Sequence, residues 1–127
     1  MTHKYAVDEA DPLTQAGVIE SLWVNNLVGH DAASAEAKLQ LGYVSNPAGR
    51  GAVVLLQSDG GTEAHGALGL HPRRFHLGPR EIGAIGLADY AVNASHRSLG
   101  PALMLMRRGV QLSVERFGLT YGFPNAK

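Results

Sequence analysis

The sequence has no cysteine and no excess of charge of either sign. Without cysteine, the 127 residues form no disulfide and carry no thiol chemistry, and a structural zinc site is disfavoured. None of the six histidines forms the H-x-x-x-H pair of a metal-binding helix. Eleven Lys and Arg balance eleven Asp and Glu, whereas dedicated nucleic-acid-binding proteins carry a basic excess. We therefore expect neither a metal nor a nucleic-acid partner.

Long apolar runs are also missing. The N-terminal stretch MTHKYAVDEADP lacks the apolar segment of a secretory signal, and no run approaches the length of a membrane span. We therefore expect a cytoplasmic protein with no membrane partner. Internal repeats and low-complexity segments are absent as well, and a chain of 127 residues is long enough to bury a core. The sequence thus predicts a single domain over 1–127.

Hydrophobic periodicity predicts an α+β (mixed α/β) domain with the element order β-α-α-β-β-β-α-β. Short apolar segments predict strands, and apolar residues at helical spacing predict helices. The last strand, helix and strand of this order form a βαβ unit, so its two strands should be parallel in an otherwise largely antiparallel sheet. The expected strands cover 4–10, 52–56, 63–70, 81–92 and 119–123, and the expected helices cover 12–28, 34–41 and 101–117.

Local signals predict where these elements begin and end. Asp11 followed by Pro12 predicts the start of the first helix, and Ser34 and Gly42 predict the start and end of the second. A hairpin turn is expected over 58–61, and Gly118 is expected to end the third helix. Trp23 and one stripe of the third helix are expected in the core; the stripe comprises Leu103, Met106, Val110, Val114 and Phe117.

The stretch HPRRFHLGPR, 71–80, predicts a basic connection because it holds two prolines and several charges. Arg73, Arg74 and Arg80 concentrate positive charge there. They form either a patch for an acidic substrate or for the 3′-phosphate of CoA, or an ordinary solvated hairpin. His71 and His76 flank a Pro-Arg-Arg stretch, 72–74, and are expected to be solvated.

The start of the third helix is a candidate anion site. A helix N-terminus presents unpaired amides and the positive end of the helix dipole. Arg97, Ser98 and Gly100 precede it, and Pro101 removes one donor, which leaves the amides of Gly100, Ala102 and Leu103 as the cradle. The alternative is an ordinary connection with helix-start chemistry.

The stretch VNASHRSLGPA, 92–102, resembles the acetyl-CoA signature of the GCN5-related N-acetyltransferases, called GNAT proteins below. That signature is an Arg or Gln, two residues, a Gly, one residue, and a Gly or Ala; here it reads RSLGPA, 97–102. It follows a long fourth strand and opens the third helix, as in the family. The order of the upstream elements agrees too, so the resemblance covers nearly the whole chain. It implies a GNAT-like sheet with helices on both faces.

The resemblance further implies an enzyme that transfers an acetyl or other acyl group from acyl-CoA to a primary amine of a small molecule or peptide. The CoA pyrophosphate would lie on the amides from Ser98 to Leu103 with Arg97 beside it, and pantetheine would pair with strand 88–92 as an added strand does. The implied acetyl-CoA-binding residues are Tyr90, Val92, Arg97, Ser98, Leu99, Gly100, Ala102 and Leu103.

The sequence departs from the family at the catalytic base. Many members carry a carboxylate on the fourth strand where this chain has Gly86. Asp89 is the candidate catalytic base instead, but it lies on the opposite face from Gly86 unless a β-bulge reverses the alternation. Alternatively, Asp89 is an acid at a strand end that pairs with a neighbouring Arg or a backbone amide.

The second departure is length. The family continues past the fifth strand with a helix and two more strands, a region that commonly supplies the Tyr that protonates the thiolate, and this chain reaches only Lys127. Tyr121 comes too early in the chain for that role. We expect the C-terminal part of the fold to be missing and a homodimer to form through the exposed edge of strand 119–123. The alternatives to an enzyme are a non-catalytic acyl-CoA-binding module and a half-domain that needs a partner chain.

Overall fold

The computed structural model describes residues 4–60, 63–116 and 119–122. Five strands form one sheet in the order β1-β2-β3-β4-β5, in which every neighbouring pair is antiparallel except the parallel pair β4 and β5. The predicted α+β class and the βαβ unit are confirmed. The strands are β1 (Tyr5–Ala10), β2 (Ala52–Ser58), β3 (Ala64–Leu77), β4 (Arg80–Val92) and β5 (Leu119–Gly122).

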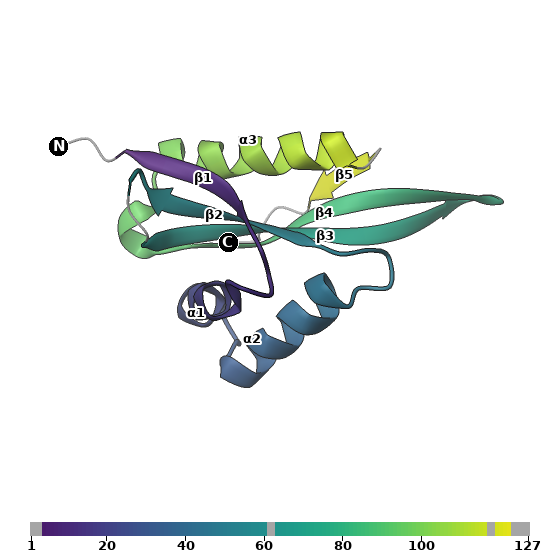
Figure 1. Ribbon diagram of the computed structural model, residues 1–127. Coiled ribbons are helices and arrows are strands. Elements are labelled where there is room, and N and C mark those ends of the chain that lie inside the picture. Colours follow the sequence, from purple (N-terminus) through teal and green to yellow (C-terminus); the bar gives the residue numbers. More distant parts are fainter. Residues whose placement is uncertain (1–3, 61–62, 117–118, 123–127) are drawn as a thin grey trace.

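Helices cover both faces of the sheet, as expected (Figure 1). Helices α1 (Ala16–Asn26) and α2 (Ala32–Leu39) lie on one face, and α3 (Leu99–Arg116) runs along the other. A π-helical turn, Gln40–Val44, extends α2, and a 3-10 turn, Ala94–His96, leads from β4 toward α3. The core therefore has two layers. Ile19, Trp23 and Tyr43 lie in the α1–α2 layer, and Leu68, Ile85 and Leu105 lie in the α3 layer, all almost fully buried.

Two predicted helix starts were wrong by a few residues. Helix α1 begins at Ala16, because Asp11 instead stabilises the turn before it: the Asp11 carboxylate accepts a 2.8 Å hydrogen bond from the Leu13 amide. Helix α2 begins earlier than predicted, after Asp31. Asp31 accepts from the Ser34 amide at 2.8 Å while the Ser34 hydroxyl accepts from the Asp31 amide at 2.9 Å. Ser34 is thus the third residue of the helix and closes a capping box with Asp31.

Gly42 does not end the second helix. The chain continues through it in the π-helical turn. A Cβ on Gly42 would lie 2.6 Å from Nε2 of His71, so the glycine makes room for a side chain from the sheet. The expectation that His71 is solvated is therefore wrong: its ring is half-buried and stands edge-on to Tyr43, with 5.3 Å between the ring centroids.

The stretch 71–80 is not a connection. It completes β3, makes a two-residue turn at Gly78 and Pro79, and begins β4, with Leu77 opposite Arg80. Pro72 is tolerated in β3 because β2 begins at Ala52, opposite Leu70, so that Pro72 has only β4 as a neighbouring strand. The result is a long hairpin that projects beyond the rest of the sheet (Figure 1).

The predicted core stripe of α3 faces outward. Leu103, Met106, Val110 and Val114 are each more than a third exposed, and Val114 is 68% exposed. The face that packs on the sheet contains Leu105, Gly109, Leu112 and Ser113 instead. Gly109 allows the close approach, since a Cβ there would lie 2.7 Å from Leu68. The predictions for Phe117 and Gly118, and part of the turn at 58–61, fall outside the described residues.

Candidate functional site

Strands β4 and β5 pair over a short distance and then separate. Their register runs from Ala84 opposite Leu119 to Leu87 opposite Gly122. Beyond Leu87, the β4 backbone over 88–92 pairs with β3 on one side and has no strand partner on the other within the described part of the chain. This is the stretch along which the family resemblance implies that pantetheine lies.

Two connected clefts open where the strands separate. The first has a volume of about 670 Å³ and extends toward the α1–α2 loop and α3; the second has about 610 Å³ and extends along the β3–β4 hairpin. They share the lining residues Lys38, Leu87, Ala88, Asp89 and Tyr121. The first cleft is also lined by Leu27, Val28, His30, Leu68, Tyr90, Met106, Thr120 and Gly122, and the second by Leu41, Gly42, His71, Arg73 and Gly86.

A β-bulge in β4 turns Asp89 toward α2. Ala88 pairs with Gly69 and Ala91 with Ala67, so two residues of β4 oppose the single Leu68. Asp89 has a φ of 55°, a left-handed conformation that Asp tolerates better than most side chains. The bulge reverses the alternation and places the Asp89 carboxylate on the Gly86 side of the sheet. A bulge is the condition under which Asp89 shares the face of Gly86, and β4 has that bulge.

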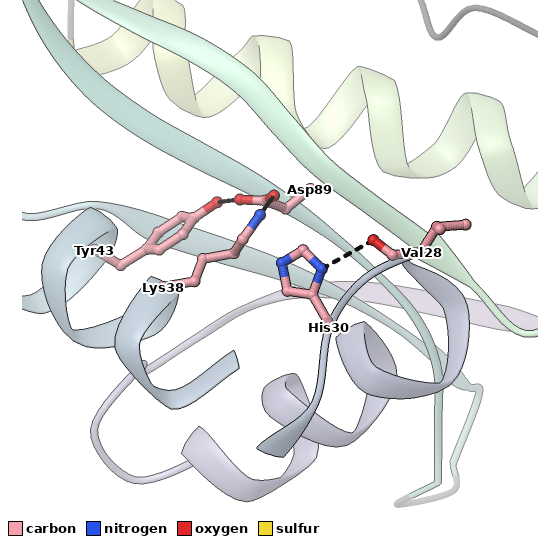
Figure 2. A network of polar contacts seen from close by, with 5 residues as sticks. All are labelled: Val28, His30, Lys38, Tyr43 and Asp89. Carbon is pink, nitrogen blue, oxygen red and sulfur yellow. Dashed lines mark hydrogen bonds and ion pairs between the residues drawn. The ribbon is translucent and has the colours of Figure 1, made fainter. Parts of the chain in front are cut away.

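Both oxygens of the Asp89 carboxylate are already bound (Figure 2). Lys38 Nζ donates to Oδ1 at 2.5 Å, and the Tyr43 hydroxyl donates to Oδ2 at 2.5 Å. Burial, together with the Asp89 charge, raises the pKa of Tyr43 well above 10, so Tyr43 stays protonated and keeps donating. Asp89 is therefore paired, although with a Lys and a Tyr rather than with the expected Arg or amide. Neither Lys38 nor Tyr43 was predicted as a partner of Asp89.

Tyr121 fills the space that a side chain at position 86 would take. A Cβ on Gly86 would lie 2.9 Å from both Oη and Cζ of the Tyr121 ring. The ring also contacts Phe75 on the hairpin, with 5.3 Å between centroids. A phenol from β5 thus occupies the place where the family resemblance implies a carboxylate. This pairing of Gly86 with Tyr121 was not predicted, because the two residues lie on different strands.

His71 and Arg73 line the outer part of the second cleft from β3. Burial lowers the pKa of His71 below 6.5, and the positive charges of Arg73 and Lys38 lower it further against the opposing effect of Asp89. The imidazole of His71 is therefore neutral near pH 7 and able to accept a proton.

The segment between β4 and α3 is fixed by side-chain contacts. Arg97 Nε donates to the Val92 carbonyl at 2.7 Å, and its Nη2 donates to Asn26 Oδ1 at 3.1 Å. The ring of His96 stacks on that of His65 at 3.8 Å and bonds the Tyr5 hydroxyl through Nδ1 at 2.8 Å. The segment is thus tied to α1 and to the sheet.

The predicted anion cradle lies at the start of α3, beyond the end of β4. The amide of Ala102 donates to the Ser98 carbonyl at 3.3 Å, within the first helical turn. At this helix start, the amides of Ser98, Leu99 and Gly100 have no acceptor among the described residues. All three lie in the range 98–103 that the resemblance implies, and Gly100 also belongs to the cradle predicted from helix-start chemistry. Gly100 is open, since nothing lies within 4 Å of a Cβ built on it. Leu99 and Leu103 are exposed, Tyr90 lines the first cleft and Val92 is buried under α3.

Within the described residues, no three His, Asp or Glu side chains are grouped so that they could hold a metal ion. Over the same residues, every helix is too short or too polar to cross a membrane.

The fold of this chain is similar to those of several solved acyltransferase structures. No family model and no curated protein matches this sequence. Among solved structures, a probable N-acyltransferase from Enterococcus faecalis superposes with a TM-score of 0.77 at 12% identity. An acetyltransferase of the GNAT family from Staphylococcus aureus gives 0.70 at 9%, over 97% of this chain and 88% of that one. The chain has the GNAT fold.

GNAT structures differ in how much of their length this chain spans. It covers 80% of the aminoglycoside N-acetyltransferase AAC(6')-Iy, solved in complex with CoA, to which 98% of this chain aligns with a TM-score of 0.65 and 15% identity. It spans only 30% of the Enterococcus faecalis protein, although 97% of this chain aligns there. The resemblance found in the sequence is thus confirmed at the level of the fold.

Proposed function

We propose that the chain binds an acyl-CoA in the first cleft and transfers its acyl group to a primary amine that enters by the second. The observation that carries this proposal is the β4 backbone over 88–92, which has no strand partner on its β5 side among the described residues. This stretch borders the first cleft and ends near the start of α3. The same fold occurs in AAC(6')-Iy, solved both with CoA and with a CoA-linked bisubstrate analogue.

The residues present fit such a ligand. We infer that the backbone of Tyr90 and the amide of Val92 pair with the amides of pantetheine as an added strand would, while the Val92 carbonyl already accepts from Arg97. The amides of Ser98, Leu99 and Gly100, at the positive end of α3, are placed to bind the pyrophosphate.

Arg97 supports this site in two ways. Its bonds to Val92 and Asn26 hold the segment that presents the amides, and its guanidinium adds positive charge near the phosphates. A charge reversal at Arg97 should therefore weaken acyl-CoA binding.

In this transfer the amine nitrogen bonds to the thioester carbonyl carbon, the C–S bond breaks, and CoA leaves as a thiolate that takes up the proton lost by the amine. The protein supplies position and a path for that proton. Asp89 is poorly suited to accept the proton of the amine, because its two carboxylate oxygens already accept hydrogen bonds from Lys38 and Tyr43. His71, neutral near pH 7, is the better proton acceptor in the second cleft. Tyr121 lines both clefts and is placed near the site of attack.

Thermal unfolding with and without acetyl-CoA tests the proposal. A ligand at a hundred times its Kd should add roughly 2.7 kcal/mol to the free energy of unfolding, a shift of several degrees in a domain of this size. Arg97→Glu should reduce that shift, whereas Arg107→Glu, an equal charge change on an exposed site of α3, should keep it. A cooperative wild-type transition that acetyl-CoA does not move would overturn the proposal.

A second candidate is an acyl-CoA-binding module that performs no transfer. It is favoured by one observation: the only carboxylate among the described residues that line the two clefts, Asp89, is held by two partners. Acetyl-CoA consumption across a panel of amines separates the candidates. A module binds the thioester and leaves it intact.

A further inference from the structure

The outer part of the second cleft carries an unbalanced positive charge. Its charged side chains in the described chain are Lys38, Arg73 and Asp89. Lys38 and Asp89 neutralise each other through their 2.5 Å ion pair. His71 adds no charge near pH 7, because burial and its cationic neighbours lower its pKa. Arg73 is therefore left without a compensating carboxylate in the cleft.

Arg73 differs from the arginine beside it. Arg74 points to the other face of β3, where it forms an ion pair with Glu81 at 3.4 Å and donates to the Pro47 carbonyl at 2.8 Å. No hydrogen bond or ion pair engages the Arg73 guanidinium within residues 4–60, 63–116 and 119–122, although its charge acts on His71 and Tyr43. A guanidinium with free donors at the rim of a cleft is suited to a carboxylate or phosphate, which it binds through paired hydrogen bonds.

We propose that the amine accepted in the second cleft also carries an anionic group, a carboxylate or a phosphate, which Arg73 binds. The inference rests on the proposed function, which sets the site of attack near Tyr121. Tyr121 and Ala88 both line the two clefts, so Ala88 marks the place of the amine on β4. Arg73 pairs with Ala84, four residues before Ala88 along β4, or about 13 Å of strand. The long Arg side chain bridges part of that distance, so a short linker between the amine and the anion fits.

The same charges disfavour polycationic acceptors. A second ammonium group in the outer cleft would lie beside Arg73, with no unpaired carboxylate among the described lining residues to receive it. Like charges in one site cost binding free energy, and such repulsion is a common source of specificity. The fold is shared with aminoglycoside acetyltransferases, but the acceptor class we infer here is different.

Matched amines test this inference. The panel is γ-aminobutyrate, its neutral amide, putrescine and phosphoethanolamine, each offered with acetyl-CoA while thioester loss is followed. We expect the two anionic amines to give a higher kcat/KM than the amide, and putrescine to give the lowest. Comparing γ-aminobutyrate with phosphoethanolamine shows whether the site prefers a carboxylate or a phosphate. Binding of the same four amines is measured in parallel by NMR chemical shifts, without acetyl-CoA.

Two neighbouring substitutions make the test specific. Arg73→Gln should reduce the preference for γ-aminobutyrate over its amide about fivefold, the effect of losing a partly exposed ion pair. Arg74→Gln removes the same charge from the other face and should leave the preference unchanged. A preference equal in both variants and the wild type overturns the inference, as does faster acylation or tighter binding of putrescine.

The two proposals fail in different ways. If acetyl-CoA neither shifts the unfolding temperature nor is consumed, the proposed function fails, and the anion site is then judged by the NMR titrations alone. If acetyl-CoA binds but the anionic amines show no advantage in binding or turnover, only the acceptor inference fails.

Discussion

At the scale of single residues, the centre of the site is a short chain of polar contacts. Tyr43 donates to Asp89, which also accepts from Lys38, and the two donors come from the end of α2 and the turn that extends it. Asp89 itself sits at a bulge with a left-handed backbone. These contacts tie the α1–α2 layer to β4 beside both clefts.

Replacing Tyr43 by Phe should destabilise the fold. The change removes one hydrogen bond to a mostly buried carboxylate and leaves Lys38 as its partner among the described residues. We expect a loss of about 2 kcal/mol in the free energy of unfolding, measured by urea denaturation. Combining Tyr43→Phe with Asp89→Asn should cost less than the sum of the two single changes. Additive losses would contradict a direct interaction.

His71 should titrate below pH 6.5. Burial lowers its pKa, and the charge of Arg73 is the next largest cause. NMR titration of the His71 ring protons measures the pKa directly. Arg73→Gln should move the pKa upward, since it removes a neighbouring positive charge. A wild-type pKa at or above 6.5, or one that Arg73→Gln does not change, would contradict the described environment.

The sequence predicted part of this residue-scale arrangement. Strand alternation was enough to predict that Asp89 needs a bulge to lie on the face of Gly86, because a shift of one residue in register moves a side chain to the other face of the sheet. The partners could not be predicted, since Lys38 and Tyr43 lie 51 and 46 residues away in the chain. Such contacts depend on how helices pack on the sheet. Local patterns do not encode them.

At the scale of elements, α2 owes its start to the capping box of Asp31 and Ser34. Hydrogen bonds from Ser34 lower the pKa of Asp31 below 3.8. The ionised carboxylate therefore stabilises the fold above about pH 3.8, and this contribution is lost as the pH falls through the lower, folded-state pKa.

The variant Asp31→Asn isolates that charge, because Asn is an equally good cap. We expect the wild type to be the more stable protein at neutral pH, where the ionised Asp31 also interacts with the helix dipole. The difference between the two urea midpoints should vanish well below pH 3.8. A difference that stays constant with pH would mean that the charge makes no contribution.

Helix α3 and the β3–β4 hairpin are the elements that sequence patterns described least well. The apolar stripe of α3 faces outward because the contact face uses small residues, Gly109 and Ser113, which let the helix approach the sheet. The prolines of the hairpin suggested a loop, yet Pro72 lies where β3 lacks a second neighbour and Pro79 lies in the turn. Hydrophobicity and proline content alone do not identify such positions.

At the scale of the whole molecule, the order and direction of the strands were predictable. The βαβ rule and the family resemblance both require β5 to lie parallel to β4, and it does. The separation of β4 from β5 and the two clefts required the structure, because they depend on where pairing stops. The resemblance implied that pantetheine lies along strand 88–92, and it gave no account of Arg73 or Tyr121 in the second cleft.

The molecule has two features that favour self-association. Strand β5 is the last strand of the described sheet, and the apolar stripe of α3 is exposed. We expect light scattering to detect a homodimer at high protein concentration. The double variant Met106→Lys, Val110→Lys adds charge to the exposed stripe of α3 and leaves β5 unchanged. If this variant still dimerises, the dimer forms through the strand edge; if it is a monomer, the dimer forms through α3. A monomer at every concentration would contradict the prediction.

Trp23 is the only tryptophan of the chain and is fully buried. Its ring lies 5.5 Å from that of Tyr43, and the Lys38 ammonium lies 5.8 Å from its ring centre. Both neighbours contact Asp89 at the junction of the clefts. The chain therefore contains its own fluorophore next to the residues that hold Asp89. Indole emission should report any ligand that displaces Lys38, without a dye or label.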